Sequence, residues 1–150
     1  MNMKKVAAAV LRRYQTRNPF KICDMMGINV VFTDLNGTRG FFHHAFNVDT
    51  IYIDDGLSGY VQEFVCAHEL GHALLHADYN AVYLDTRTYQ VMGKLENAAD
   101  RFAAFLLWPD DDELLEYADY SYERLSFAMG LPENLVRWRF EQINAEWMES

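Results

Sequence analysis

Long apolar runs are missing from this sequence of 150 residues. No stretch of about 18 uncharged apolar residues occurs, which argues against a membrane-spanning helix. The apolar segment near the start is interrupted by Arg12 and Arg13, so it is too short for a secretory signal peptide. We therefore expect a cytoplasmic protein that does not enter a membrane.

Cysteine and positive charge are also scarce. The two cysteines, Cys23 and Cys66, lack the paired spacing of a cysteine-rich metal site, so two reduced thiols are favoured over a disulfide. Thirteen Lys and Arg residues stand against 22 Asp and Glu residues, which gives a formal net charge of −9. A chain of this charge repels a phosphate backbone, and direct nucleic-acid binding is therefore disfavoured.

Apolar residues, by contrast, are plentiful. Hydrophobic residues make up 51% of the chain and aromatic residues 15%, which is typical of a folded globule and not of a disordered segment. The chain is long enough for one core and too short for two. Without an internal repeat or an evident linker, we expect a single domain over residues 1–150, with a core over about 1–109 and a helical region over about 110–150.

The order of the expected elements predicts an α+β fold with a small three-stranded sheet. Helical composition and cap residues predict helices over residues 3–17, 19–26, 59–77, 92–108, 111–118, 121–130 and 132–148. Gly27 is expected to end the second of these as a left-handed cap. Runs rich in β-branched and aromatic residues predict strands over residues 28–34, 40–47 and 50–55, with a turn at Asn36-Gly37. Residues 78–90 lack clear periodicity and are expected to form a loop.

The helix over residues 59–77 carries the pattern HExxH, at His68-Glu69-Leu70-Gly71-His72. Four residues advance a helix by about 400°, so the two imidazoles point about 40° apart on one face and can share one metal ion. Glu69 can then accept a proton from water bound in the open coordination position. Zinc lowers the pKa of such a water molecule to about 7. We expect Gly71 to allow close packing.

A catalytic zinc ion needs a third protein ligand, and Glu96 is the best candidate. It lies on the next expected helix, and its i, i+4 spacing from Asp100 places both carboxylates on one face. Glu96 could therefore bind the metal, while Asp100 accepts a hydrogen bond from the outer N–H of a ligating histidine.

Other candidates for the site are weaker. His76 lies two helical turns beyond His68, a rise of about 12 Å, which is too far for one straight helix to bring both to one ion. Asp78 ranks below Glu96 because the glycine that a longer HExxH signature needs is replaced by Leu75. Adjacent strand residues face opposite ways, so at most one of His43 and His44 can face a cleft. Tyr83 and Tyr89 are both possible oxyanion-stabilising residues, and that role stays unassigned.

The residues resemble those of the ImmA/IrrE family of metallo-endopeptidases over nearly the whole chain. The resemblance is carried by NPFKICDMMGINVVF, Gly40-Phe41, IYIDD, AHELGHALLH, ENAADRFAAFLLWP and YERLSFAMGLPENLVRWRFE. It implies a minimal zincin-like catalytic core with one Zn²⁺ on His68, His72 and Glu96, Glu69 as catalytic base, and a small helical C-terminal region. The chain departs from the usual family pattern at Ala98, Asp100 and Trp108.

Family resemblance also implies a substrate class. Members of this family commonly cut a helix-turn-helix transcriptional repressor and are often encoded in prophages or other mobile elements. We therefore expect a cytoplasmic endopeptidase whose protein substrate is such a repressor, with the segment GFFHHAFN as the sheet edge that binds it. The alternative is a metal-bound binding module that sequesters a repressor without cleaving it, although an intact Glu69 favours hydrolysis.

The C-terminal segment could itself be mistaken for a DNA-binding helix-turn-helix. Its mixed charge and amphipathic spacing fit core packing better. The residues expected to face the core are Leu125, Phe127, Leu131, Leu135, Trp138 and Phe140.

Overall fold

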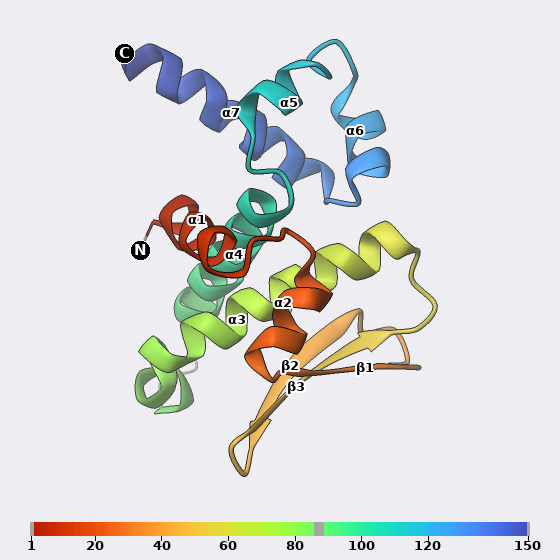
Figure 1. The fold of residues 1–150 in the computed structure, drawn as a ribbon, viewed down its shortest axis with the longest axis vertical. Coiled ribbons are helices and arrows are strands. Elements are labelled where there is room, and N and C mark those ends of the chain that lie inside the picture. The colour runs from red at the N-terminus through yellow and green to blue at the C-terminus, as the bar shows by residue number, and fades with distance from the viewer. Residues whose placement is uncertain (1, 86–88, 150) are drawn as a thin grey trace.

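A computed structural model describes the backbone of residues 2–85 and 89–149 and the side chains of residues 2–75 and 93–143. Three strands and seven helices are assigned within these residues (Figure 1). The helices are α1 (Met3–Tyr14), α2 (Pro19–Met26), α3 (Gly59–Asp85), α4 (Tyr89–Leu107), α5 (Asp111–Leu115), α6 (Tyr122–Met129) and α7 (Glu133–Glu149). The strands are β1 (Asn29–Thr33), β2 (Gly40–Ala45) and β3 (Val48–Asp54). The predicted α+β class with a small three-stranded sheet is confirmed.

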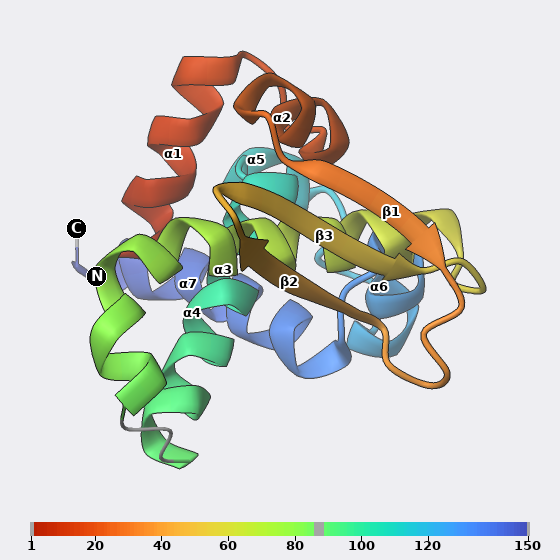
Figure 2. The ribbon, with the colours of Figure 1, turned by 90° about the horizontal axis from the view of Figure 1, so that it is seen from below.

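The sheet has the strand order β1-β3-β2. β3 pairs in parallel with β1, opposing Ile51 to Val30, and antiparallel with β2, opposing Ile51 to Phe42. Helix α3 packs on β2 and β3, and α2 packs on β1, so the helices cover one face of the sheet (Figure 2). Ile51 and Ile53 point to that covered face and are fully buried. β2 is an edge strand, as the sequence predicts for GFFHHAFN.

Helices α3 and α4 pack closely through Gly71. A Cβ atom at this position would lie 3.1 Å from Cδ1 of Phe102 and 3.2 Å from Cα of Ala99, both on α4. Since Ala99 presents backbone at this point, the helices can approach this closely only without a side chain on residue 71. The predicted close packing at Gly71 is confirmed, and it sets the distance between the two helices that carry the candidate site.

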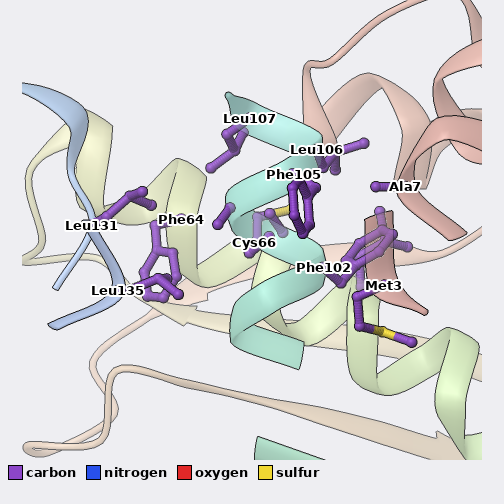
Figure 3. Packing of buried hydrophobic residues seen from close by; sticks show 14 of the residues in the cluster. Met3, Ala7, Phe64, Cys66, Phe102, Phe105, Leu106, Leu107, Leu131 and Leu135 are labelled. Carbon is purple, nitrogen blue, oxygen red and sulfur yellow. The ribbon is translucent and has the colours of Figure 1, made fainter. Parts of the chain in front are cut away.

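One hydrophobic core joins the N-terminal and C-terminal elements. Figure 3 shows side chains of α1, α3 and α4 in the same cluster as Leu131 and Leu135. Cys23 and Cys66 are fully buried in this core as unlinked thiols whose sulfur atoms lie 3.9 Å apart. Hydrogen bonding to Cys23 and burial raise the pKa of the Cys66 thiol, which keeps it protonated.

A buried arginine of α7 forms an ion pair and hydrogen bonds with the segment after α4. Arg139 is fully buried and lies 2.6 Å from a carboxylate oxygen of Asp111. It also donates hydrogen bonds to the carbonyl oxygens of Trp108 at 3.0 Å and Pro109 at 3.3 Å. The carbonyls that follow α4 are thereby paired within the protein.

Several local predictions were wrong. The helix expected over residues 3–17 ends at Tyr14, because Gln15 is left-handed with φ at 57°. The helix α3 continues through Asp85, so most of the expected loop over 78–90 is helical; residues 77–85 contain no Gly or Pro, and a helix need not be amphipathic to persist. The strand expected over 40–47 ends at Ala45, because Phe46 and Asn47 have φ angles of 53° and 60° and form the turn into β3. Phe127 is 91% exposed instead of facing the core.

Other features agree with the sequence. Gly27 ends α2 with φ at 77°, and Asn36 and Gly37 form a turn with φ at 53° and 96°. Leu125, Leu131, Leu135 and Phe140 are buried. Among the described residues, no helix combines the length and the apolar character needed to span a membrane.

Candidate metal centre

Helix α3 brings two imidazoles together on one face. The Nε2 atoms of His68 and His72 lie 3.1 Å apart, and the rings are nearly perpendicular, with centroids 4.7 Å apart. Their side chains are 15% and 18% exposed, so the nitrogens face an opening and the rings are mostly covered. This is the arrangement that one helical turn gives to residues four apart.

Helix α4 adds two carboxylates. Glu96 places one oxygen 2.7 Å from Nε2 of His72 and the other 3.2 Å from Nε2 of His68. Asp100, one turn further along α4, lies on the opposite side of the His68 ring, with a carboxylate oxygen 2.7 Å from Nδ1. His68 therefore donates from Nδ1 to Asp100 and directs Nε2 toward Glu96 and His72.

These contacts perturb the charges of the groups in the absence of a metal. Burial lowers the pKa of His68, but hydrogen bonds to Asp100 and Glu96 and the nearby carboxylate charges outweigh it and raise the pKa to about 10. Hydrogen bonds from His68 and His72 hold the pKa of Glu96 well below its usual range. The carboxylate of Glu96 is thus ionised and faces two nitrogens, which suits a shared cation.

Glu69 is a buried carboxylate beside this cluster. It is 6% exposed, and its Oε2 atom has no hydrogen-bond partner among the described residues. Burial raises its pKa against the lowering effect of the neighbouring imidazoles. The ligand atoms of His68, Glu69 and His72 lie within 4.8 Å of one another. A buried polar atom without a partner is costly, and a water molecule held between a metal ion and this oxygen would satisfy it.

The cluster opens into a cavity of about 500 Å³. Its described lining residues are Arg39, Gly40, Phe41, Phe42, Phe64, Val65, His68, Glu69, His72, Leu75, Leu95, Glu96, Asp100 and Pro132. Gly40 is required at the start of β2, because a Cβ atom there would collide with Val65 and lie 2.8 Å from the carbonyl oxygen of Tyr52. The close contact of β2 with α3 puts the edge strand along the cavity.

All residues predicted for the site on the basis of the motif meet at this cavity: His68, Glu69, His72, Glu96 and Asp100. The side chains of His76, Asp78, Tyr83 and Tyr89 lie outside the described residues. His43 and His44 are not among the described residues that line the cavity, and His44 pairs with Asp49 across the β2–β3 hairpin.

Sequence reasoning missed the contributions of Arg39, Phe64 and Pro132 to the cavity. The helical recurrence of Phe64 on α3 is that of a core residue and gives no sign of a cavity. Arg39 is a single charge between a turn and a strand, and Pro132 reaches the cavity only through tertiary packing. No local pattern marks either residue.

Comparison with known proteins adds an independent finding. A family model described as the IrrE N-terminal-like domain, peptidase M78, matches residues 23–141. The chain is 34% identical over 136 residues to uncharacterized immunity region protein 2 of Bacillus phage phi105, covering 89% of this chain and 86% of that protein. It is 30% identical over 148 residues to metallopeptidase ImmA of Bacillus subtilis (strain 168), covering 95% of this chain and 86% of that protein.

Proposed function

The chain belongs to the IrrE N-terminal-like, peptidase M78 family, and from this membership we propose that it is a zinc-dependent endopeptidase with a zincin-like catalytic core. His68, His72 and Glu96 would hold the zinc ion, and three protein ligands are the usual number in a catalytic zinc site. The observation that carries the proposal is the convergence of three ligand side chains beside a buried carboxylate oxygen without a partner.

Each residue has a separate role in hydrolysis. The metal supplies a polarised, acidic water molecule near neutral pH. Glu69 would act as the base that accepts a proton at its unpartnered Oε2, and its burial suits this task because a raised pKa brings a carboxylate closer to the pH at which it works. Asp100 keeps the His68 ring oriented and its Nδ1 protonated, so that Nε2 stays available to the metal.

The edge of the sheet suggests how a peptide binds. Strand β2 is paired on one side only, by β3, and its residues Gly40, Phe41 and Phe42 line the same cavity as the histidines. An extended substrate segment can therefore add to β2 through main-chain hydrogen bonds and pass in front of the metal. Apolar lining residues on α3 and α4, including Leu75 and Leu95, favour apolar substrate side chains near the scissile bond.

The substrate is a helix-turn-helix repressor of a mobile element or prophage, and cleavage takes place in the cytoplasm where that repressor acts. Similarity to a phage immunity-region protein and to the metallopeptidase ImmA supports this substrate class. A module that only sequesters the repressor has no use for a buried base beside the metal, so Glu69 argues against that alternative.

Co-expression tests the proposal directly. The chain is expressed with the repressor encoded next to it, as wild type and as Glu69→Gln. We expect a shortened repressor with the wild type and an intact repressor with the variant, while both proteins retain zinc. A repressor that stays full length with the wild type, or is shortened equally by Glu69→Gln, would contradict the proposed hydrolysis.

A further inference from the structure

Arg39 is a cation at the mouth of the candidate active site that the proposed hydrolysis does not use. It directly precedes β2, and its carbonyl oxygen accepts a 2.9 Å hydrogen bond from the backbone N–H of Asp54. The next residue, Gly40, is held between α3 and β3, so the backbone that carries Arg39 is fixed. Its side chain is exposed and lines the cavity.

The guanidinium of Arg39 contacts the aromatic ring of Phe64 and no carboxylate of the described residues. Its central carbon lies 5.9 Å from the centroid of the Phe64 ring, a cation–π distance. Arg39 forms no ion pair with the described residues. A contact with a ring uses no carboxylate, and a guanidinium can bind a substrate carboxylate in a bidentate manner.

The charges around Arg39 make it distinctive. Among the described residues that line the cavity, it is the only Lys or Arg, whereas Glu69, Glu96 and Asp100 are acidic. The whole chain carries a formal charge of −9. Among the described lining residues, Arg39 is therefore the one permanently cationic side chain that can pair with a substrate carboxylate.

Arg39 lies within reach of a peptide bound at the metal. The centroid of the Phe64 ring is 5.9 Å from the central carbon of Arg39 and 5.9 Å from the centroid of the His68 ring. The guanidinium is therefore no more than twice that distance from a metal ligand. An extended chain advances about 3.3 Å per residue, so this upper limit corresponds to at most about four substrate residues.

We propose that Arg39 is a specificity-determining residue that selects substrates with an Asp or Glu side chain within about four residues of the scissile bond. The inference rests on the proposed peptidase function. It narrows the substrate class to segments that combine apolar side chains at the metal with one carboxylate at a fixed distance along the extended chain.

The experiment measures cleavage preference and binding separately. Zinc-loaded wild type, Arg39→Gln and Arg39→Glu digest a proteome-derived peptide library, and mass spectrometry identifies the cleaved sites. A pair of quenched fluorescent peptides is then made from the preferred sequence, with Glu or the isosteric Gln at the enriched position. Fluorescence anisotropy measures binding of the same peptide pair to the single variant Glu69→Gln and to the double variant Glu69→Gln/Arg39→Gln. Both variants lack the proposed base, so this measurement does not depend on turnover.

Arg124→Glu is the matched control. Arg124 is also exposed and stacks on an aromatic ring, with its central carbon 4.8 Å from the Tyr120 ring centroid, but it is not a lining residue of the metal-site cavity. Arg39→Glu and Arg124→Glu change the net charge equally, so a general charge effect would appear in both variants. Thermal unfolding of each variant verifies that the fold is retained.

We expect the sites cleaved by wild type to carry Asp or Glu at one defined position within about four residues of the scissile bond, and wild type to prefer the Glu peptide. Arg39→Gln should lower kcat/KM for the Glu peptide by about fivefold to tenfold and change that for the Gln peptide by less than about twofold. Arg39→Glu should shift the enriched residues to Lys and Arg, and Arg124→Glu should behave as wild type. The anisotropy affinities should fall in parallel with kcat/KM.

Two results would overturn the inference alone. One is cleavage by wild type without acidic enrichment, and the other is an acidic enrichment that persists in Arg39→Gln. If wild type cleaves no peptide of the library, both the inference and the proposed peptidase function fail. Cleavage without acidic preference leaves the peptidase function standing.

Discussion

His68 contacts two carboxylates of the site, one at each ring nitrogen. Its ring lies between Asp100 at Nδ1 and Glu96 at Nε2, at 2.7 Å and 3.2 Å. In the metal-free protein these carboxylates stabilise a doubly protonated ring, and a metal ion must displace the Nε2 proton. Zinc binding is therefore coupled to proton release.

This coupling gives a pH-dependent prediction. The pKa of His68 is raised to about 10 in the metal-free protein, so raising the pH toward that value removes a competing proton and tightens zinc binding, whereas acidification weakens it. We expect zinc affinity to rise by up to about tenfold per pH unit between about pH 7 and 9 from this group. Isothermal titration calorimetry in buffers with different ionisation enthalpies counts the protons released.

Asp100→Asn serves as the matched variant for the same measurement. It keeps an acceptor near Nδ1 but removes the negative charge that raises the pKa of His68. Fewer protons should be released per zinc ion than in the wild type. Equal release by the two proteins at the same pH would show that Asp100 does not set the protonation of His68.

The site residues could be predicted because each belongs to a short pattern with a geometric meaning. The i, i+4 spacing of His68 and His72, and of Glu96 and Asp100, fixes a shared face whatever the rest of the chain does. Arg39 belongs to no such pattern, because its position at the cavity depends on contacts between residues far apart in the sequence. Phe127 is 91% exposed because it lies two residues, about 200° around the helix, from the buried Leu125 and Met129 of α6.

At the scale of secondary structure, the site depends on the distance between α3 and α4. His68 and His72 belong to α3, whereas Glu96 and Asp100 belong to α4. Gly71 lies within the HExxH pattern and contacts Phe102 and Ala99 of α4. A longer side chain at residue 71 would separate the carboxylates from the imidazoles.

We therefore expect Gly71→Leu to lower both stability and zinc affinity. Overpacking against the Ala99 backbone should decrease the free energy of unfolding by about 1–3 kcal/mol, measured by urea denaturation of the metal-free protein. Gly93→Leu is the control, since a Cβ atom at Gly93 of α4 meets no atom within 4 Å and helix propensity should raise stability by about 0.5–1 kcal/mol. Equal effects of the two substitutions would contradict the close-packing account.

Helices and strands were predicted well where composition agrees with cap and turn residues, and less well where the two conflict. Gly27 ends α2 as predicted because a left-handed cap favours glycine. The turn between β2 and β3 uses Phe46 and Asn47 at positive φ, although an aromatic residue rarely adopts that conformation. The order β1-β3-β2 also depends on non-local pairing that no single strand encodes.

At the scale of the whole molecule, the C-terminal helices form part of the same structure as the site. Pro132 lines the metal-site cavity, and the Leu131 side chain belongs to the shared core. Gly130 packs against α3, where a Cβ atom would lie 2.6 Å from the carbonyl oxygen of Tyr60. Arg139 connects α7 to the end of α4 by an ion pair with Asp111 and hydrogen bonds to two carbonyls.

Replacing Arg139 should therefore destabilise the protein as a whole. Arg139→Leu leaves Asp111 without its ion pair and the carbonyls of Trp108 and Pro109 without these donors, which should lower the free energy of unfolding by about 3 kcal/mol. Arg137→Leu, two residues away and exposed, should change it by less than about 0.5 kcal/mol. Chemical denaturation compares them, and similar stability of the two variants would contradict this role for Arg139.

The most direct test of the proposed centre is the zinc affinity of single ligand variants, measured by competition with a chromophoric chelator. Wild type and Glu69→Gln should each bind one zinc ion per chain, because Glu69 is proposed as a base and not as a ligand. Glu96→Ala and His72→Ala should bind zinc about 100-fold more weakly or worse, since each loses one of three protein ligands. Wild-type affinity in Glu96→Ala, or loss of zinc in Glu69→Gln, would contradict the proposed ligand set.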